Sequence, residues 1–397
     1  GMTGKMRDAM CRAAVNAAEA IGYKGAGTVE FIVDGSDGLK EDRFWFMEMN
    51  TRLQVEHPIT EEITGIDLVA WQLNVAMGRP MEKKQKDVSI EGHSFEARIY
   101  AEDPNNNFLP DTGKIIHLHF PSSARVDTGI RTGDIVSPFF DPMLAKIITH
   151  AKDRLSALSK LKKALKETEI VGIKTNVNFL YNLTENSEFK MGVVQTNLIE
   201  QNIEKLVSHK SISTQAIIAA TMSYFSPRSG HSSYSHWIDI SHKVQLFCNN
   251  ELLDVQLSQP DVNQIQIFFY GEAFDIFFCK NHWSFKGIQL PEAKKFDNKI
   301  IVFDEHHFLF ESQDPFQSTK DSNLQTTDIL SPMPGMVSKI YIENGSKVIK
   351  GQRILALEAM KMEYEVVAPN DCFIKTVNFE VGDFVQSGTK LCDFSEV

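Results

Sequence analysis

Two copies of one short pattern flank residues 358–362, which are Glu358-Ala359-Met360-Lys361-Met362. Each copy consists of a proline, a strand, two glycine turns and a second strand. The first copy has Pro334, Gly345, Gly351 and Ile354, and the second has Pro369, Gly382, Gly388 and Leu391. Two such halves indicate a flattened barrel with pseudo-twofold symmetry over residues 326–397. The sequence predicts that the central stretch forms the hairpin that joins the two halves.

Lys361 lies at the tip of that predicted hairpin, between Met360 and Met362. Most exposed lysines are solvated surface residues without a further role. Methionine is usually buried, so two methionines beside a turn lysine are unusual. A rigid barrel that presents one amine to a modifying enzyme suits a swinging prosthetic group. The position of Lys361 therefore favours covalent modification over a plain surface role.

The motif Ala359-Met360-Lys361-Met362, preceded by Met333-Pro334-Gly335, resembles the biotinyl domain of biotin-dependent carboxylases. Lipoyl domains have the same fold but usually carry Asp-Lys-Ala at the tip, which favours biotin over lipoate. The resemblance implies that a biotin protein ligase attaches biotin covalently to Lys361.

The chain of 397 residues is long enough for several domains. Helix and strand patterns occupy residues 1–86, and mixed strands and helices occupy 87–206. Over 207–325, one predicted helix, Thr214–Phe225, precedes short alternating strands, which is typical of a small antiparallel barrel. Residues 317–328 are polar and lack periodicity, so we expect a linker there. The predicted fold class is α+β with four domains, of which the fourth covers 326–397.

The formal net charge of −11 opposes nonspecific binding to nucleic acid or anionic lipid, because both require a positive surface. No stretch approaches about 18 uninterrupted apolar residues, so we expect no membrane span. The five cysteines are scattered without a CxxC pair, which favours a reducing compartment over a disulfide framework. The N-terminus lacks the pattern of a signal peptide. We therefore expect the cytoplasm, or the mitochondrial matrix in a eukaryote.

A strand predicted over Phe44–Val55 carries alternating polar side chains toward its end. Because strand side chains alternate between faces, one face would collect Glu48, Asn50, Arg52, Gln54 and Glu56. A solvated face seldom interleaves Asn and Gln with both signs of charge, whereas an active-site wall does. Glu30 lies on the preceding predicted strand, Thr28–Val33. If the two strands form a hairpin, Glu30, Glu48 and the Asn50 oxygen make a site for Mg²⁺ or Mn²⁺.

The block Glu48-Met49-Asn50-Thr51-Arg52-Leu53-Gln54-Val55-Glu56-His57-Pro58 closely resembles the ATP-grasp domain of biotin carboxylase. The resemblance covers residues 4–205 and continues through Glu96-Ala97-Arg98-Ile99, Ala101-Glu102-Asp103-Pro104, Phe140-Asp141-Pro142-Met143 and Gly172-Ile173-Lys174-Thr175-Asn176. It implies ATP as a cofactor. It also implies that Glu30, Glu48 and Asn50 are the metal ligands.

The same resemblance assigns roles to five further residues. It implies that Arg52, Gln54 and the backbone N–H of Val55 bind bicarbonate. Glu56 would be the general base for bicarbonate, which is a weak nucleophile until it loses its second proton. ATP and bicarbonate would then form carboxyphosphate, which releases CO₂ beside biotin. Arg98 would hold the ureido oxygen of biotin and stabilise its enolate-like charge.

The chain contains no glycine-rich phosphate loop, neither GxGxxG nor GxxxxGK[ST]. A complete biotin carboxylase has an N-terminal domain and a glycine-rich lid before the residues that match the start of this chain. We therefore expect the isolated chain to be inactive in ATP cleavage.

The predicted barrel over 207–325 resembles, more weakly, a domain of 3-methylcrotonyl-CoA and propionyl-CoA carboxylases. That domain attaches the biotin subunit to the carboxyltransferase subunit. The pattern of residues 4–205, including Gly4-Lys5-Met6-Arg7, is most similar to the 3-methylcrotonyl enzymes. A plain structural spacer is the alternative interpretation of the barrel.

Two functions follow from the resemblance. The first is a ligase, the biotin-carrying (alpha) subunit of an acyl-CoA carboxylase. It would carboxylate biotin and pass CO₂ to an acyl-CoA, 3-methylcrotonyl-CoA, on a carboxyltransferase (beta) subunit, and it would self-associate through the biotin carboxylase part. Propionyl-CoA and geranyl-CoA are alternative substrates. The second function is a non-catalytic biotin carrier and docking chain.

Overall fold

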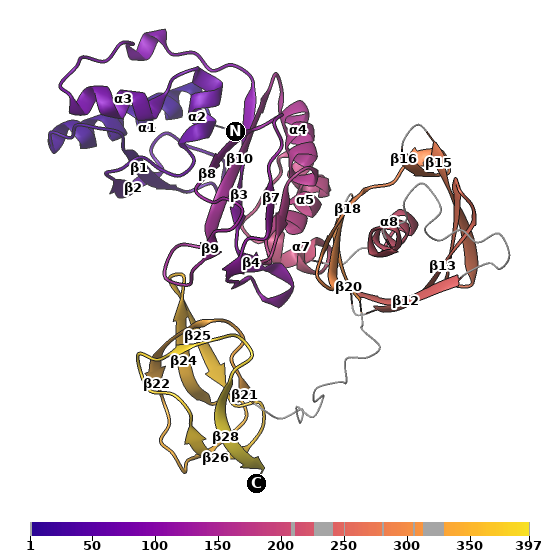
Figure 1. The fold of residues 1–397 in the computed structure, drawn as a ribbon. Helices are drawn as coiled ribbons and strands as arrows, with labels where there is room; N and C mark the ends of the chain where they lie inside the picture. The colour runs from indigo at the N-terminus through magenta and orange to yellow at the C-terminus, as the bar shows by residue number, and fades with distance from the viewer. Residues whose placement is uncertain are drawn as a thin grey trace. The chain divides into compact units, whose positions relative to one another are not determined.

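The computed structural model describes residues 2–207, 211–225, 241–249, 251–279, 282–304, 306–312 and 329–396 (Figure 1). The predicted linker over 317–328 lies outside these ranges. The chain divides into two compact units, Gly1–Ala97 with Ile148–Leu161 and Arg98–Ile147 with Lys162–Val397. None of the described helices has the length and apolar character that a membrane crossing requires.

The first unit combines helices with one hairpin. It contains α1 (Gly4–Ala20), β1 (Thr28–Val33), β2 (Phe44–Asn50), α2 (His57–Thr64), α3 (Leu68–Ala76) and the 3₁₀ helix η1 (Gln85–Asp87). Thr3 caps α1, because its Oγ1 accepts the Met6 N–H at 3.2 Å. Asp67 caps α3 in the same way and accepts the Ala70 N–H at 2.7 Å. These caps satisfy backbone donors that have no partner inside the helix.

The predicted hairpin of β1 and β2 is formed. Its antiparallel register places Glu30 opposite Glu48 and Thr28 opposite Asn50. A β-bulge follows Glu30, because the next pair joins Phe31 to Phe46 and leaves one extra residue on β2. The hairpin therefore holds two carboxylates directly across from each other at the end of β2.

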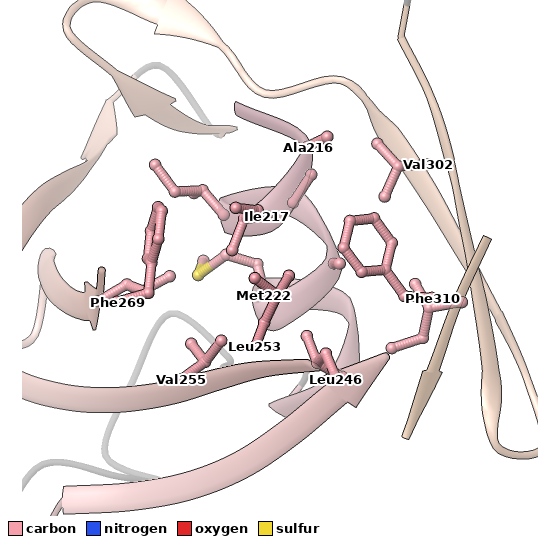
Figure 2. Close-up of a cluster of buried hydrophobic side chains, with 14 of the residues drawn as sticks. Ala216, Ile217, Met222, Leu246, Leu253, Val255, Phe269, Val302 and Phe310 are labelled. Atoms are coloured by element: carbon pink, nitrogen blue, oxygen red, sulfur yellow. The ribbon is translucent and has the colours of Figure 1, made fainter. Parts of the chain in front are cut away.

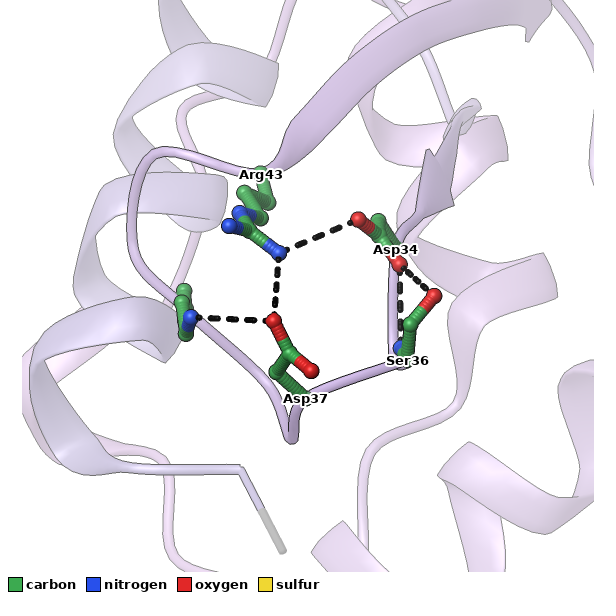
Figure 3. A network of polar contacts seen from close by, with 5 residues as sticks. Asp34, Ser36, Asp37 and Arg43 are labelled. Carbon is green, nitrogen blue, oxygen red and sulfur yellow. Dashed lines mark hydrogen bonds and ion pairs between the residues drawn. The ribbon is translucent and has the colours of Figure 1, made fainter.

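Ion pairs and hydrogen bonds close the turn that joins β1 to β2 (Figure 3). Arg43 Nη1 lies 3.3 Å from Asp34 Oδ2 and 3.4 Å from Asp37 Oδ2. Asp34 Oδ1 also accepts the Ser36 N–H at 2.9 Å. Hydrogen bonds from the side chain and backbone of Ser36, together with the charge of Arg43, lower the pKa of Asp34. The closed turn supports the register of the two strands.

The strand predicted to continue to Val55 ends at Asn50. Residues 51–56 instead form a loop and turn that lead into α2, with Glu56 as the N-cap residue and Pro58 in the first turn. A proline at the start of a helix is favoured, because its missing N–H needs no partner there. The prediction that polar side chains alternate along one strand was therefore wrong beyond Asn50.

The second unit contains several short strands and helices besides its two barrels. They are β4 (Glu102–Asp103), η2 (Pro104–Asn106), β5 (Leu109–Pro110), β6 (Gly113–Lys114), β7 (His117–His119), β8 (Arg125–Thr128), β9 (Ile135–Val136), β11 (Glu169–Val171), α5 (Val177–Glu185), α6 (Ser187–Met191) and α7 (Leu198–Val207). Three elements run across a boundary between the units, namely β3 (His93–Tyr100), β10 (Met143–Ala151) and α4 (Arg154–Lys166). Strands β3, β10 and β8 form one sheet, and β7 pairs with β11.

The predicted small barrel is confirmed as an antiparallel sheet that curves around helix α8 (Thr214–Phe225) (Figure 1). Its strands are β12 (Ser241–Cys248), β13 (Glu251–Asp261), β14 (Gln264–Phe269), β15 (Glu272–Cys279), β16 (His282–Phe285), β17 (Ile288–Gln289), β18 (Glu292–Phe296), β19 (Lys299–Phe303) and β20 (His307–Ser312). They lie in the order β17, β16, β15, β14, β13, β12, β20, β19, β18.

Helix α8 is rich in apolar residues, as is typical of a helix that other elements enclose. Its residues 216–220 are at most 3% exposed. Figure 2 shows Ile217 and Met222 among inward-facing side chains of the strands, including Phe269 and Phe310. The helix therefore fills the space that the curved sheet surrounds.

A buried carboxylate joins the barrel to other strands of the second unit. Glu169 on β11 is 7% exposed, and its Oε2 lies 2.6 Å from His117 Nε2 and 2.7 Å from Lys294 Nζ on β18. Burial raises the pKa of Glu169, but the hydrogen bonds from Lys294 and His117 outweigh burial, and the net pKa is lowered. Asn178 on α5 adds two backbone contacts to His307 on β20, at 3.2 and 3.3 Å.

The C-terminal barrel consists of two four-stranded sheets that correspond to the predicted halves. One sheet has the order β21 (Ile329–Leu330), β28 (Lys390–Glu396), β26 (Cys372–Val377), β23 (Lys347–Val348). The other has the order β25 (Met362–Val367), β24 (Arg353–Ala359), β22 (Gly335–Ile340), β27 (Phe384–Val385). The short strand of each half pairs with the other half, as a pseudo-twofold axis requires. Ile354 and Leu391, equivalent positions of the repeat, are both fully buried.

The barrel core can be tested at two neighbouring positions of β20. Phe310 is fully buried and Leu309 is 42% exposed. We expect Phe310→Ala to lower the free energy of unfolding of the barrel by about 3–5 kcal/mol, because it leaves a cavity in the core. Leu309→Ala is the control and should change it far less. Chemical denaturation of the full chain measures both, and equal losses would contradict the inward orientation of Phe310.

The Glu169 cluster predicts a pH dependence. The pKa of Glu169 in the folded chain is below its ordinary value of 4.5. Its stabilising contribution is therefore complete above that ordinary value and is lost as the pH falls through the lower, folded pKa. Below about pH 4.5, we expect the free energy of unfolding to fall more steeply for the wild type than for Glu169→Gln.

Glu292→Gln is the matched control, because Glu292 contacts the same lysine at 3.1 Å but is 60% exposed in its side chain. It should leave the acid dependence close to that of the wild type. Chemical denaturation at a series of acidic pH values measures the free energy of unfolding of all three proteins. Identical slopes for the wild type and Glu169→Gln would refute the role of the buried carboxylate.

Candidate functional site

The predicted metal ligands converge at the end of the β1–β2 hairpin. Asn50 Nδ2 donates to Glu30 Oε1 at 2.8 Å and to Glu48 Oε1 at 3.1 Å. Gln54, which follows β2 in the loop, also donates to Glu30 Oε1 from Nε2 at 3.3 Å. The structure thus brings together four of the residues that the sequence singled out.

Two carboxylates at opposed register positions repel each other. Within the described part of the chain, no lysine or arginine pairs with Glu30 or Glu48, and only amide donors reach them. Carboxylate and amide oxygens are the ligands that Mg²⁺ and Mn²⁺ prefer. A divalent cation would relieve the repulsion, so the donor set of Glu30, Glu48 and Asn50 fits such an ion.

Further oxygen ligands would have to come from a substrate. No cluster of three or more His, Cys, Asp or Glu side chains suited to a metal occurs among the described residues. Mg²⁺ is commonly held by one or two carboxylates together with substrate phosphates and water. The hairpin matches that incomplete kind of site rather than a closed, all-protein metal cage.

The predicted bicarbonate residues lie in the loop between β2 and α2. Arg52 is exposed, and its Nη1 contacts only the neighbouring Leu53 carbonyl, at 3.3 Å, within the described residues. The guanidinium is therefore available to an anion, and its two-pronged donors suit a planar oxyanion. Val55 lies in the turn before α2, and Glu56 is the exposed N-cap residue of that helix.

Arg98 lies on β3, in the part of the strand that belongs to the second unit. Asn176 holds the strand on both sides of Ile99. Its Nδ2 donates to the Arg98 carbonyl at 3.1 Å, and its Oδ1 accepts the Tyr100 N–H at 3.0 Å. Asn176 ends the motif Gly172-Ile173-Lys174-Thr175-Asn176, but its position in the sequence indicates no role for it. No spacing rule could have found this role, because 78 positions separate Asn176 from Arg98.

Lys361 lies at the tip of the hairpin between β24 and β25. Ala359 pairs with Met362, so the turn consists of Met360 and Lys361, with φ of 50° and 65°. Positive φ at both central residues is the geometry of a type I′ turn, which matches the twist of hairpin strands. The side chain of Lys361 is 79% exposed, whereas Met360 is only 4% exposed. The turn therefore presents the amine and buries the preceding methionine.

Gly335 at the start of β22 supports this tip. A Cβ at Gly335 would lie 3.0 Å from the Glu358 carbonyl oxygen and 3.5 Å from the Ala359 Cβ. Only glycine permits such a close approach of two backbones. This contact explains why the Met333-Pro334-Gly335 motif accompanies the lysine motif in the sequence, although 26 positions separate Gly335 from Lys361.

Three known domain families match the chain. The biotin carboxylase C-terminal domain matches residues 96–201. The ATP-binding domain of the carbamoyl-phosphate synthase L chain matches residues 1–84. The family described as biotin-requiring enzyme matches residues 327–394, which include the hairpin of Lys361.

Curated relatives match along nearly the whole chain. The mitochondrial methylcrotonoyl-CoA carboxylase subunit alpha of Rattus norvegicus is 36% identical over 100% of this chain and 59% of the rat protein. The mitochondrial propionyl-CoA carboxylase alpha chain of Homo sapiens is 32% identical over 98% of this chain and 57% of that protein. The chain therefore spans less than two thirds of the length of these relatives.

Among solved structures, the biotin carboxylase subunit of pyruvate carboxylase is 39% identical, with a TM-score of 0.49, and covers 53% of this chain and 46% of that one. The family matches and the curated relatives carry the assignment. In chain order, the matches are an ATP-binding domain, a biotin carboxylase C-terminal domain and a biotin-requiring enzyme domain, and the chain is similar over nearly its whole length to alpha subunits of acyl-CoA carboxylases.

Proposed function

We propose that this chain is the biotin-carrying subunit of an acyl-CoA carboxylase that uses ATP and bicarbonate. One observation carries the proposal. The same chain holds an opposed carboxylate pair bridged by Asn50 and an exposed lysine on a type I′ turn of a symmetric barrel. The first arrangement suits nucleotide chemistry, and the second suits a carried prosthetic group.

In this proposal, the loop after β2 binds and activates bicarbonate. Arg52 and Gln54 supply donors to the anion, and the backbone N–H of Val55 supplies another. Glu56 accepts the bicarbonate proton, which strengthens the nucleophile that attacks ATP. Because the loop leaves the strand after Asn50, these groups can surround an anion rather than line a flat strand face.

Glu30, Glu48 and Asn50 would hold Mg²⁺ or Mn²⁺. When bound, the cation neutralises phosphate charge as the phosphoryl group is transferred. The chain's own contribution is to hold two carboxylates at one position through the hairpin register and the Asn50 bridge.

Biotin would be attached to Lys361, and its ureido ring supplies the atom that accepts CO₂. Arg98 would donate to the ureido oxygen, where negative charge develops. The hydrogen bonds of Asn176 to the backbone on both sides of Ile99 fix the strand from which Arg98 projects. Lys361 needs only an exposed amine, which the turn provides.

The partners are part of the proposal. By analogy with the alpha subunits among its relatives, the chain would work with a carboxyltransferase (beta) subunit that binds the acyl-CoA, 3-methylcrotonyl-CoA. The barrel around α8 would attach the two subunits, and the biotin carboxylase part would self-associate. A biotin protein ligase would modify Lys361. A eukaryotic chain of this kind would reside in the mitochondrial matrix, as its relatives' names indicate, and a bacterial one in the cytoplasm.

The second candidate is a carrier that accepts biotin and docks a partner without ATP chemistry. The well-formed C-terminal barrel favours it, because a carrier needs only this barrel and its exposed lysine. Propionyl-CoA and geranyl-CoA stay open as acyl substrates under the first candidate.

Biotin attachment has a direct test. After coexpression with a biotin protein ligase, the full chain should gain the mass of one biotinyl group, and Lys361→Ala should gain none. Lys350→Ala is the control, because Lys350 is another exposed lysine of the same barrel, and it should be modified normally. Intact mass spectrometry measures all three. Biotin on the Lys361→Ala chain would rule out the assignment.

ATP chemistry separates the two candidates. We expect bicarbonate-dependent ATP hydrolysis once the chain is extended at its N-terminus to the length of its relatives. Glu56→Gln in that protein should lower kcat by at least about a hundredfold, because the general base is lost. Glu41→Gln, on the exposed β1–β2 turn, is the control. Phosphate release measures the rate, and no bicarbonate-dependent hydrolysis by the extended wild type would favour the pure carrier.

A further inference from the structure

The tip of the carrier hairpin rests on a loop of the second unit, residues 137–142 between β9 and β10, here called the docking loop. The Met360 N–H donates to the Pro138 carbonyl at 2.8 Å. Lys361 Nζ lies 3.3 Å from Asp141 Oδ2. The rings of Phe139 and Phe384 lie 5.9 Å apart. A hydrogen bond, an ion pair and an aromatic contact thus join the loop to the barrel.

The geometry of the turn supplies the donor for this contact. In a two-residue type I′ hairpin, the first central residue has no cross-strand partner for its N–H. That residue is Met360, and its N–H finds the Pro138 carbonyl. A backbone donor left unpaired in a buried position is unfavourable, and Met360 is only 4% exposed. The docking loop therefore supplies a hydrogen-bond acceptor for a backbone N–H that has no partner within the hairpin.

The carrier tip covers only part of the docking loop, whose two aromatic side chains stay open to solvent beside it. Phe139 and Phe140 are 70% and 74% exposed, which is unusual for two adjacent aromatic side chains. Asp141 is anchored by its own backbone contact, because its Oδ1 accepts the Met143 N–H at 3.1 Å. Its second oxygen is thereby oriented toward the lysine of the carrier.

We propose that the docking loop is a binding surface for the tip of this chain's own carrier barrel, and that Asp141 distinguishes the unmodified tip from the biotinylated one. The inference rests on the proposed function, because it requires Lys361 to be the modified residue. It goes beyond that function by assigning the loop and Asp141 a role that depends on the charge of the lysine.

Biotinylation changes the charge that Asp141 meets. The ligase would use ATP to activate the biotin carboxyl group as an acyl adenylate. The bond from Nζ to the acyl carbon then forms, the acyl–phosphate bond breaks, AMP leaves, and the ammonium group gives up two protons. A neutral amide replaces a positive charge. The ion pair with Asp141 is lost, whereas the contacts at Pro138 and Phe139 do not depend on modification.

The strength of the ion pair between Lys361 and Asp141 depends on how far the two side chains are exposed to solvent. The side chains of Lys361 and Asp141 are 79% and 48% exposed, so solvent screens their attraction. Exposed ion pairs of this kind change an equilibrium by about two- to fivefold. A difference of that size would bias the unmodified carrier toward the loop and release the biotinylated carrier to move. A stronger contact would oppose that movement.

Amide hydrogen exchange of the full chain can report on docking through the Met360 N–H. This N–H donates to the Pro138 carbonyl, so it should exchange slowly while the tip is docked. We expect Lys361→Arg, which keeps the charge, to leave the exchange rate near that of the unmodified wild type. Lys361→Gln, which removes the charge, should raise it about two- to fivefold. Equal rates in Lys361→Arg and Lys361→Gln would overturn the role of charge.

Asp141→Asn keeps the acceptor for the Met143 N–H and removes only the charge. It should raise the Met360 exchange rate by the same factor as Lys361→Gln. Asp134→Asn is the matched control, because Asp134 accepts the Arg131 N–H at 2.7 Å in a similar turn of the same unit. It should have no effect. Equal effects of the two substitutions would refute recognition by Asp141.

The biotinylated chain completes the test. Its Met360 N–H should exchange about two- to fivefold faster than that of the unmodified chain, and Asp141→Asn should then add nothing. Slower or unchanged exchange after biotinylation would overturn the proposal. If Lys361 takes up no biotin, the proposed function fails, whereas the Lys361 and Asp141 variants still report on docking independently.

Discussion

The candidate site of the first unit depends on one interaction, the repulsion between the opposed carboxylates of Glu30 and Glu48. Their register places two like charges across a hairpin, and among the described residues only the amides of Asn50 and Gln54 reach them. Such a pair is unfavourable by itself and becomes favourable when a cation and phosphate oxygens complete it. The closed turn at Arg43 supports the register, and therefore the position of both carboxylates.

The carrier barrel exposes the amine of Lys361 on a rigid support. Two sheets exchange their short strands, so each half of the repeat stabilises the other. The type I′ turn then directs Lys361 outward and leaves the Met360 N–H to an external acceptor. The contacts at the docking loop are few and partly solvated, so they hold the tip only weakly.

Apolar contacts stabilise the interior of the barrel around α8, whereas polar contacts attach the barrel to neighbouring strands. Its interior is largely apolar, because buried side chains of the helix and of the surrounding strands form one hydrophobic cluster. Its attachment to the neighbouring strands is polar, through Glu169, Lys294 and His117. A buried carboxylate that two polar side chains contact at once specifies one geometry more strictly than an apolar contact of similar area.

The sequence by itself determined the features that depend on local pattern. The repeat identified the C-terminal barrel and placed Lys361 at its tip, and alternation identified the hairpin that pairs Glu30 with Glu48. The predicted helix Thr214–Phe225 was confirmed as α8 with the same ends. These features could be predicted because each depends on residues that are close in the chain or related by a fixed period.

Only the tertiary structure decided the end of β2, the buried Glu169 cluster, the support of Arg98 by Asn176 and the contact of the carrier tip with Asp141. At β2, the alternation of polar residues in the sequence continues beyond Asn50. The strand nevertheless ends at Asn50, because the chain turns there toward the start of α2. In the other cases the partners are 52 to 220 positions apart. Side chains so far apart meet only because the packing of whole elements brings them together, and no local pattern records that packing.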